Sequence, residues 1–311
     1  MIRPGLSVFR RDAGQLQFGT LGDDRFVVED RPGLVGLLRL LDGTRDMGTV
    51  ACLADQRVPA LRDDPVSLIA ALHREGILVD ATGCDGAEPA HESEARSLLA
   101  QGLRPGEIGD RLARRSQSCV ELRSDPSVEP LTADIAHGLQ QAGIQTTRVA
   151  DTSATATLII GAGPDDRSTF RHLRKERMPH LSVVADGARV VVGPFVDPGL
   201  APCVECLDLR RREWDPSWPA ITAQFDAPLA YAGNGIGPAL TTATGLAAAA
   251  LVTNDVVEFC DESVPLTMTR TITVGPGVHD RSDESTGFHP SCRCRLSPRN
   301  DAVGRPDTIE A

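Results

Sequence analysis

Two close pairs of cysteines have the residue type and spacing of metal ligands. Cys203 and Cys206 lie in the segment APCVEC, and Cys292 and Cys294 lie in the segment HPSCRC, far along the sequence. Zinc takes four ligands in a tetrahedron, and two tight turns with two thiolates each supply all four and leave no open position. The sequence therefore predicts a structural zinc ion, Zn2+, held by Cys203, Cys206, Cys292 and Cys294.

A redox dithiol is the alternative interpretation of the first pair. A CxxC motif at a helix start can form a reversible disulfide, because the helix dipole lowers the pKa of a thiol there. This interpretation leaves Cys292 and Cys294 unexplained, whereas a zinc site needs both pairs. His289 could replace one cysteine as a ligand, but its position beside the second pair is more typical of loop packing, so we favour four sulfurs.

No nucleotide site or catalytic residue can be assigned from the sequence. A Rossmann-type phosphate site needs a glycine-rich turn after the first strand of its domain. The strand expected at Ser118–Leu122 is followed by Arg123–Pro126, which has no glycine, and Asp125 would repel a phosphate. The GxG at Gly161–Gly163 is interpreted as a plain turn. His180, at the start of a buried strand, is more typical of a structural histidine than of a general base.

The composition favours an ordered globular protein that binds no nucleic acid. Of the 311 residues, 41% are hydrophobic, which is enough for one large core or two moderate ones. The net charge of -11 opposes phosphate binding, which needs clustered cations. Met1–Gln15 contains no apolar run, so we expect neither a signal peptide nor an anchor. The uncharged stretch Ala227–Asn254 is too interrupted for a membrane span and indicates a buried helix, so we expect a cytoplasmic protein with no membrane contact.

The first domain, predicted to span residues 1–82, begins with a meander and continues with helices. Alternating runs separated by turn residues predict three strands, at Leu6–Arg10, Gln15–Gly19 and Arg25–Glu29. Leucine spacing, caps and prolines predict three helices, at Leu34–Leu41, from Asp46 through Leu53, and at Val66–Glu75, with a strand at Ile77–Asp80 after them. Three helices followed by a wing predict a winged-helix domain. Its third helix carries little positive charge, so we expect a partner other than DNA.

The second domain, predicted to span residues 94–296, follows a turn-rich linker at residues 83–93. Strands and helices alternate from Cys119 onward, which predicts an α/β fold with a parallel, doubly wound sheet of Rossmann-like type. The segment Leu266–Val274 is predicted to form a late edge strand. Residues 297–311 are predicted to be a flexible tail.

Four segments resemble a known family. They are PHL at Pro179–Leu181, VGPFVDPGLAPCVECLDLRR at Val192–Arg211, DPSWP at Asp215–Pro219, and HPSCRC at His289–Cys294. Together they resemble the TOMM precursor leader peptide-binding proteins. These are partners of YcaO cyclodehydratases, which modify ribosomal precursor peptides (RiPPs) to azol(in)e-containing products, and they are similar in fold to ubiquitin-activating enzymes. The resemblance is strong from Leu158 to Gln224 and at His289–Cys294.

The resemblance implies a fold and a binding mode for the leader of the precursor peptide. It implies an N-terminal winged helix that acts as a RiPP recognition element, an activating-enzyme-type domain that has lost ATP binding, and a tetracysteine zinc. In such proteins the leader adds a strand to the third strand of the meander and lies against the third helix. The residues implied in peptide binding are Arg25, Phe26, Val27, Val28, Leu68, Leu72 and Glu75. Leu68 and Leu72 could instead face the domain's own core, because part of an amphipathic helix must.

The expected function is non-catalytic. The chain would bind the leader of a precursor peptide and present the peptide to a YcaO protein, as a homodimer or within a hetero-oligomer. The alternative is an adenylating, activating-type enzyme that acts on a carboxylate, with Arg210–Arg212 as a candidate nucleotide contact. A thiol redox protein is a third possibility, based on Cys203 and Cys206.

Overall fold

The chain forms two compact units. The computed structural model describes residues 1–11, 14–20, 25–61, 64–81, 91–163, 166–224, 238–277 and 279–296. Unit 1 runs from Met1 to Ala113, and unit 2 begins at Arg114. Most of the predicted linker at 83–93 and all of the predicted tail at 297–311 lie outside the described residues.

Unit 1 begins with a small antiparallel sheet. Its strands are β1 (Val8–Arg11), β2 (Gln15–Phe18) and β3 (Phe26–Glu29), in the order β1-β2-β3. The strands match the predicted meander. Leu16 and Phe18 on β2 are fully buried and face the helices, because alternate residues of a strand point to opposite sides of the sheet.

Three helices complete the core of unit 1. They are α1 (Leu34–Leu38), α2 (Met47–Arg57) and α3 (Pro65–Arg74). Asp46 caps α2 by accepting a hydrogen bond from the backbone N–H of Thr49, and Asp64 caps α3 in the same way. Proline at the first position of α3 costs no hydrogen bond, because that N–H has no partner within a helix.

The strand predicted at Ile77–Asp80 is not formed. Leu78 makes one isolated antiparallel bridge with Ile2, so only the first residues of the chain pair with this segment. The assignment of unit 1 as a winged helix therefore stays a prediction. Two further helices follow, α4 (Glu92–Ala100) and α5 (Pro105–Gln117), which share a small apolar core that includes Leu99 and Ile108.

Unit 2 is built on a seven-stranded sheet with the order β10-β9-β8-β7-β6-β4-β5. The strands are β4 (Cys119–Ser124), β5 (Gln145–Thr147), β6 (Ala156–Ala162), β7 (His180–Asp186), β8 (Arg189–Val196), β9 (Arg270–Val274) and β10 (Arg281–Ser285). The pairs β4–β5, β4–β6 and β6–β7 are parallel, but β7–β8, β8–β9 and β9–β10 are antiparallel.

The parallel pairing predicted from the alternation after Cys119 is confirmed for β5, β4, β6 and β7, but β8, β9 and β10 pair in antiparallel fashion, so the sheet as a whole is mixed. Only Gly187 and Ala188 separate β7 from β8, and so short a connection permits only antiparallel pairing. Gly187 has a φ of 58°, which a turn of this kind requires. The prediction of a late edge strand was wrong, because β9 lies between β8 and β10.

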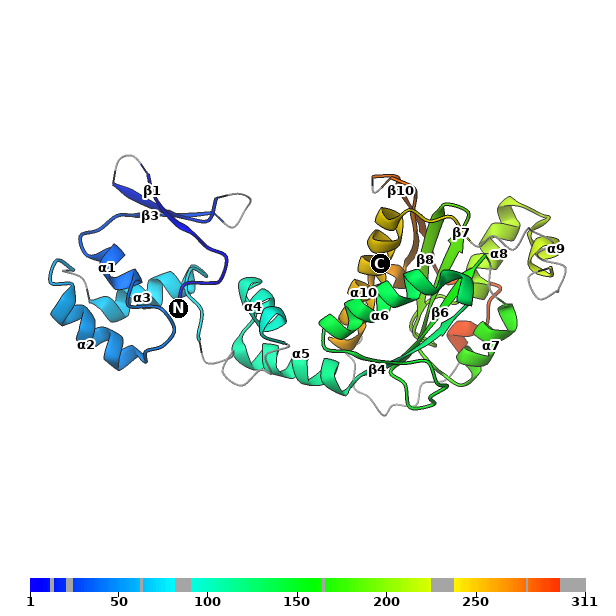
Figure 1. Ribbon diagram of the computed structural model, residues 1–311, viewed down its shortest axis with the longest axis horizontal. Helices are drawn as coiled ribbons and strands as arrows, with labels where there is room; N and C mark the ends of the chain where they lie inside the picture. The colour runs from blue at the N-terminus through cyan, green and yellow to red at the C-terminus, as the bar shows by residue number, and fades with distance from the viewer. Residues whose placement is uncertain are drawn as a thin grey trace. The chain divides into compact units, whose positions relative to one another are not determined.

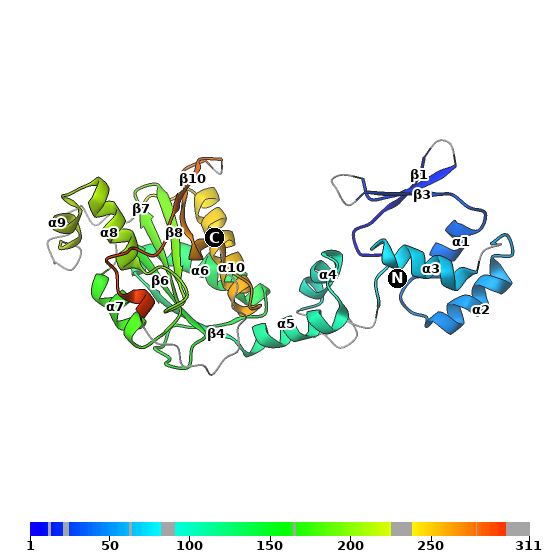
Figure 2. The ribbon, with the colours of Figure 1, turned by 180° about the vertical axis from the view of Figure 1, so that it is seen from behind.

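Helices cover both faces of the sheet in unit 2 (Figures 1 and 2). On one face, α6 (Glu129–Gln141) and α10 (Thr242–Cys260) pack over Leu158 and Ile160 of β6. On the other face, α7 (Arg167–Lys175) and α8 (Val204–Trp214) pack over Ile159. The short helix α9 (Trp218–Thr222) follows α8. Successive residues of β6 face opposite sides of the sheet, and helices cover both sides. The strand is therefore a nearly continuous apolar run, which is typical of a sheet covered on both sides.

Among the described helices, α10 is the one long and apolar enough to cross a membrane. Half of its apolar window is buried within unit 2, where Ala248, Val252 and Val256 belong to the main core. This burial agrees with the prediction of a buried helix in this part of the sequence.

Candidate metal centre

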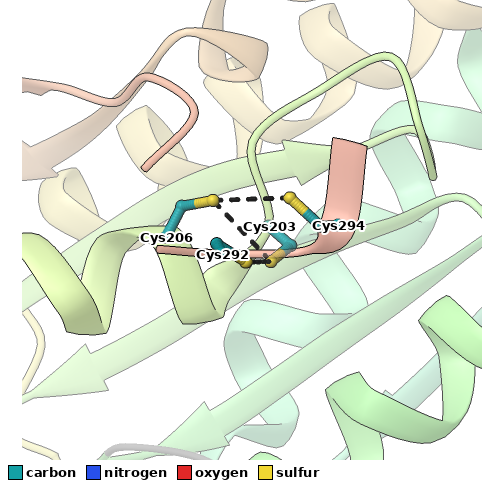
Figure 3. A group of neighbouring side chains, drawn as sticks. All are labelled: Cys203, Cys206, Cys292 and Cys294. Atoms are coloured by element: carbon teal, nitrogen blue, oxygen red, sulfur yellow. Dashed lines mark hydrogen bonds between the residues drawn. The ribbon is translucent and has the colours of Figure 1, made fainter. Parts of the chain in front are cut away.

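The four predicted cysteines converge at one point in unit 2. Cys203 is the N-cap residue of α8, and Cys206 lies in the first turn of that helix. Cys292 follows a tight turn, and Cys294 opens the 3-10 turn Cys294–Leu296. Figure 3 shows the two pairs arriving from segments far apart in the sequence, with all four side chains directed toward one another.

The distances between the sulfurs fit a tetrahedral metal site. The Sγ of Cys203 lies 4.0 Å from that of Cys206 and 3.6 Å from that of Cys292, and the Sγ atoms of Cys206 and Cys294 are 3.4 Å apart. All four lie within 4.8 Å of one another. Zinc–sulfur bonds of about 2.3 Å place tetrahedral ligands about 3.8 Å apart. Disulfide sulfurs would be about 2.0 Å apart, so these cysteines are not disulfide-bonded.

Burial and charge favour a bound cation at this site. Each of the four residues is at most 8% exposed. Hydrogen bonds from the thiols of Cys203 and Cys294 lower the pKa of Cys206 to about 2, whereas burial raises the pKa of Cys292 to about 12. The pKa of Cys294 is also raised, because its thiol hydrogen-bonds to neighbouring sulfurs. Without a cation, these pKa directions favour a charged sulfur on Cys206 beside protonated thiols on Cys292 and Cys294. A divalent metal allows all four to ionise, and an all-sulfur set is the donor set of zinc.

His289 is not a ligand in this arrangement. Its Nδ1 accepts a hydrogen bond of 3.1 Å from the backbone N–H of Ser291, so its Nε2 carries the proton and donates to Oε1 of Glu213 at 2.9 Å. Both ring nitrogens are thus used in holding the turn before Cys292. The geometry agrees with the sequence-based preference for four sulfurs over a mixed site.

The positively charged side chain of Arg174, on α7, lies beside the cysteine cluster. Nη1 of Arg174 lies 3.6 Å from Sγ of Cys203 and 2.8 Å from Oε2 of Glu205. Burial opposes the charge of Arg174, but the hydrogen bond to Glu205 and the nearby Cys203 raise the pKa of the guanidinium overall. Sequence analysis missed this residue, because Arg174 is one of several basic residues on a short polar helix.

The turn after β4 is occupied by its own side chains. Oδ1 of Asp125 accepts hydrogen bonds from the N–H of Ser127 at 2.7 Å and from its hydroxyl at 2.6 Å. The carboxylate therefore caps the 3-10 turn Pro126–Val128, at the place where a dinucleotide-binding domain would hold phosphate. Gly163 donates its N–H to the carbonyl of Ala185 at 2.7 Å, and the two residues after it lie outside the described part of the chain.

His180 has the structural role expected for it. It is 1% exposed, and its Nδ1 donates to the carbonyl of Met178 at 2.8 Å. Burial lowers the pKa of His180 to about 4, so the ring is neutral near pH 7. Arg211, in the predicted basic cluster, pairs with Glu284 at 3.2 Å and lies over the ring of Trp218 at 5.0 Å.

The predicted peptide contacts fall into an exposed set and a buried set. Arg25 and Val27 are exposed at the β3 edge, whereas Phe26 and Val28 are half-buried against the helices. Among the described strands, β3 pairs only with β2, so its other edge is open.

On α3 the prediction needs a correction. Glu75 is exposed at the end of the helix and Leu68 is half-buried, but Leu72 is 3% exposed within the core of unit 1 and cannot serve as a surface contact. Val66 of the same helix, which the sequence did not single out, is 47% exposed.

Comparisons with solved structures report on the fold. No protein-family model matches the sequence, and no characterised protein matches it by sequence. A heterocyclase solved in complex with substrate and cofactor aligns with a TM-score of 0.65 and 18% identity, over 94% of this chain and 38% of that chain. The heterocyclase TruD aligns with a TM-score of 0.64 and 17% identity, over 94% of this chain and 42% of that chain.

The E. coli protein MccB, solved with ATP, aligns with a TM-score of 0.60 and 14% identity, over 95% of this chain and 99% of MccB. At these identities the likeness is one of fold. The chain spans less than half the length of each heterocyclase and nearly the whole of MccB.

Proposed function

We propose that this chain is a non-catalytic partner protein that binds the leader of a ribosomal precursor peptide and presents the peptide to a YcaO cyclodehydratase. The partner would form azol(in)e rings or a related backbone modification. The observation that carries the proposal is the open edge of β3 in a unit joined to a heterocyclase-like α/β unit.

The β3 edge suits strand addition. Phe26–Glu29 has β2 on one side, and no described strand pairs with its other side, where an extended peptide can hydrogen-bond to the backbone. Such binding draws affinity from main-chain hydrogen bonds and specificity from side-chain pockets. Val66 and Glu75 on α3, together with half-buried Leu68, offer side-chain contacts of both apolar and charged kinds.

The length of the two heterocyclases supports an assembly in which this chain and the catalytic part are separate proteins. The two heterocyclases are more than twice as long as the part that aligns with this chain. We infer that a separate YcaO protein supplies the catalytic part, and that the two associate in a cytoplasmic complex. The Zn2+ held by Cys203, Cys206, Cys292 and Cys294 would cross-link the segments of unit 2 and take no part in chemistry.

An N-methyl scan of the peptide tests strand addition without altering the protein. Fluorescence polarisation would measure binding of the full chain to labelled leader peptides from precursor genes beside its own. Methylating one backbone nitrogen at a time should weaken binding at alternate residues, because only every second N–H of an added strand faces β3. Binding that is insensitive to all positions, or no binding at all, would contradict the proposal.

An activating-type enzyme that adenylates a carboxylate is the second candidate, because the match to MccB covers nearly all of that protein. The capped turn at Asp125 opposes it, since a carboxylate occupies the expected phosphate position. Calorimetry with ATP and magnesium separates the two candidates. Saturable ATP binding together with peptide-dependent pyrophosphate exchange would favour the enzyme.

A further inference from the structure

Three arginines line one groove of unit 1 in a chain whose net charge is -11. The groove has a volume of about 430 Å³ and lies among Arg10 on β1, Asp30 and Arg31 after β3, and α1 with Arg39 at its end. Asp30 is the one carboxylate among the lining residues. The groove is therefore locally positive on a protein that is acidic as a whole.

Two of the three arginines, Arg10 and Arg39, have N–H donors without a partner among the described residues. Arg10 contacts Asp30 through Nε at 3.2 Å, and its side chain is 73% exposed. Arg31 contacts Glu29 through Nε at 3.4 Å, with its side chain 49% exposed. Arg39 is exposed and has no ion pair or side-chain hydrogen bond with any residue in the described part of the chain. Each guanidinium carries five N–H donors in a planar fork that matches a carboxylate.

The groove continues from the strand that the proposed function uses. Asp30 and Arg31 directly follow Glu29, the last residue of β3. A peptide that runs along the open edge of β3 past Glu29 would therefore reach Asp30, whose carboxylate is contacted by Arg10 of β1 from across the sheet. Pro32 and Gly33, in the turn that leads into α1, also line the groove.

We propose that this groove binds Asp or Glu side chains that flank the strand-forming part of the bound peptide, so that the substrate class is an acidic leader. This inference rests on the proposed function and adds the chemistry of the ligand. Arg10 and Arg39 form charge-assisted hydrogen bonds to the peptide carboxylates. The acidic remainder of the chain repels such a peptide, so the groove also steers its docking.

The experiment compares two charge variants with two forms of one peptide. The protein variants are the double substitution Arg10→Gln/Arg39→Gln and the control Arg57→Gln, an exposed arginine in the last turn of α2 and outside the groove. The probes are a labelled leader peptide and the same peptide with every Asp and Glu replaced by Asn and Gln. Thermal melting establishes that each variant is folded.

We expect the double variant to bind the acidic peptide about three- to tenfold more weakly, with a shallower salt dependence, because exposed pairs contribute about 0.2–1 kcal/mol each. Arg57→Gln should bind it almost as the parent does. The amide peptide should bind weakly and equally to the parent and the double variant.

Equal effects of the double variant and Arg57→Gln would overturn the inference, as would undiminished binding of the amide peptide. The same holds if the double variant loses affinity for inorganic phosphate but binds the peptide as tightly as the parent does, since the groove would then be an anion site unrelated to the peptide. In each of these cases a period-two response to N-methylation would still support strand addition, so the two proposals fail separately.

Discussion

The guanidinium of Arg174 on α7 contacts the sulfur of Cys203 at the start of α8, with 3.6 Å between Nη1 and Sγ. Glu205, in the first turn of α8, accepts a hydrogen bond from the same nitrogen at 2.8 Å. Four thiolates around a divalent ion carry two net negative charges, so a fixed cation beside one ligand stabilises the charged set. Partners outside the ligand shell commonly change metal affinity by about 10- to 100-fold.

We therefore expect Arg174→Met to release zinc about tenfold faster than the parent protein. Release would be followed with a coloured zinc chelator in excess. Arg171→Met is the matched control, because Arg171 lies on the same helix, is exposed, and makes no contact with a cysteine sulfur among the described residues. Equal release from both variants would show that the contact with Cys203 does not stabilise the centre.

Removal of the metal should destabilise unit 2. Elemental analysis is expected to find one zinc ion per chain. A strong chelator, or the substitution Cys294→Ser, should lower the unfolding temperature, because binding free energy at a structural zinc site contributes to folding. Cys52→Ser is the control, since Cys52 is exposed on α2 in unit 1. A zinc content near zero together with a fast-reacting Cys203 would favour the redox interpretation instead.

The buried ion pair between Arg115 and Asp261 should be strongly coupled. The two side chains are each 3% exposed and make paired contacts of 2.8 and 2.6 Å. Asp261→Ala leaves a buried cation, so we expect a loss of about 3–5 kcal/mol in the free energy of unfolding.

The double variant Arg115→Met/Asp261→Leu should recover much of that loss, because it buries no charge. Asp283→Ala, which breaks an exposed pair with Arg270, should cost less than about 1 kcal/mol. Urea unfolding of the three variants measures these differences. Similar losses from Asp261→Ala and Asp283→Ala would contradict the expected coupling.

Asp255 should make the protein less stable as the pH rises, which is opposite to the effect of a carboxylate whose pKa is lowered by folding. This carboxylate on α10 is fully buried and accepts hydrogen bonds from the N–H groups of Leu266 and Thr267 at 3.2 and 3.0 Å and from the Thr267 hydroxyl. Burial raises its pKa above the ordinary value of 3.8. A raised pKa in the folded state means that its contribution is fully present below the unfolded pKa and is lost as the pH rises through the folded pKa.

The stability difference between the parent and Asp255→Asn should therefore shrink from acid to neutral pH. Urea unfolding at several pH values measures it, and any acid loss of zinc affects both proteins equally. A difference that grows toward neutral pH would contradict the expected direction.

The elements that the sequence predicted well have local signals. Asp46 and Asp64 each precede a helical run and each caps a helix, and the two cysteine pairs form one cluster although Cys203 and Cys292 are 89 positions apart. Ligand spacing makes such a cluster predictable, because two close pairs of cysteines are the usual donor set of a tetrahedral zinc site.

The errors have physical causes that a single sequence does not reveal. Strand β10 reads RSDES and has no apolar residue, since it forms an exposed edge, so no alternation marks it. A sequence that gives no signal for β10 predicts its neighbour β9 as the edge strand. Leu72 could not be assigned to the core or the surface, because the helix face that turns inward depends on tertiary packing. The role of Arg174 likewise depends on a contact between two helices.

The split of the metal ligands also determines when the centre can form during synthesis. A ribosome adds about 5–20 residues per second, so roughly 5–20 s pass between the making of Cys203 and of Cys292. Throughout that time the nascent unit 2 carries only half of its ligand set. All three strands of the unit 1 sheet have been made once Glu29 is added, so the proposed peptide-binding edge precedes the metal centre on the growing chain.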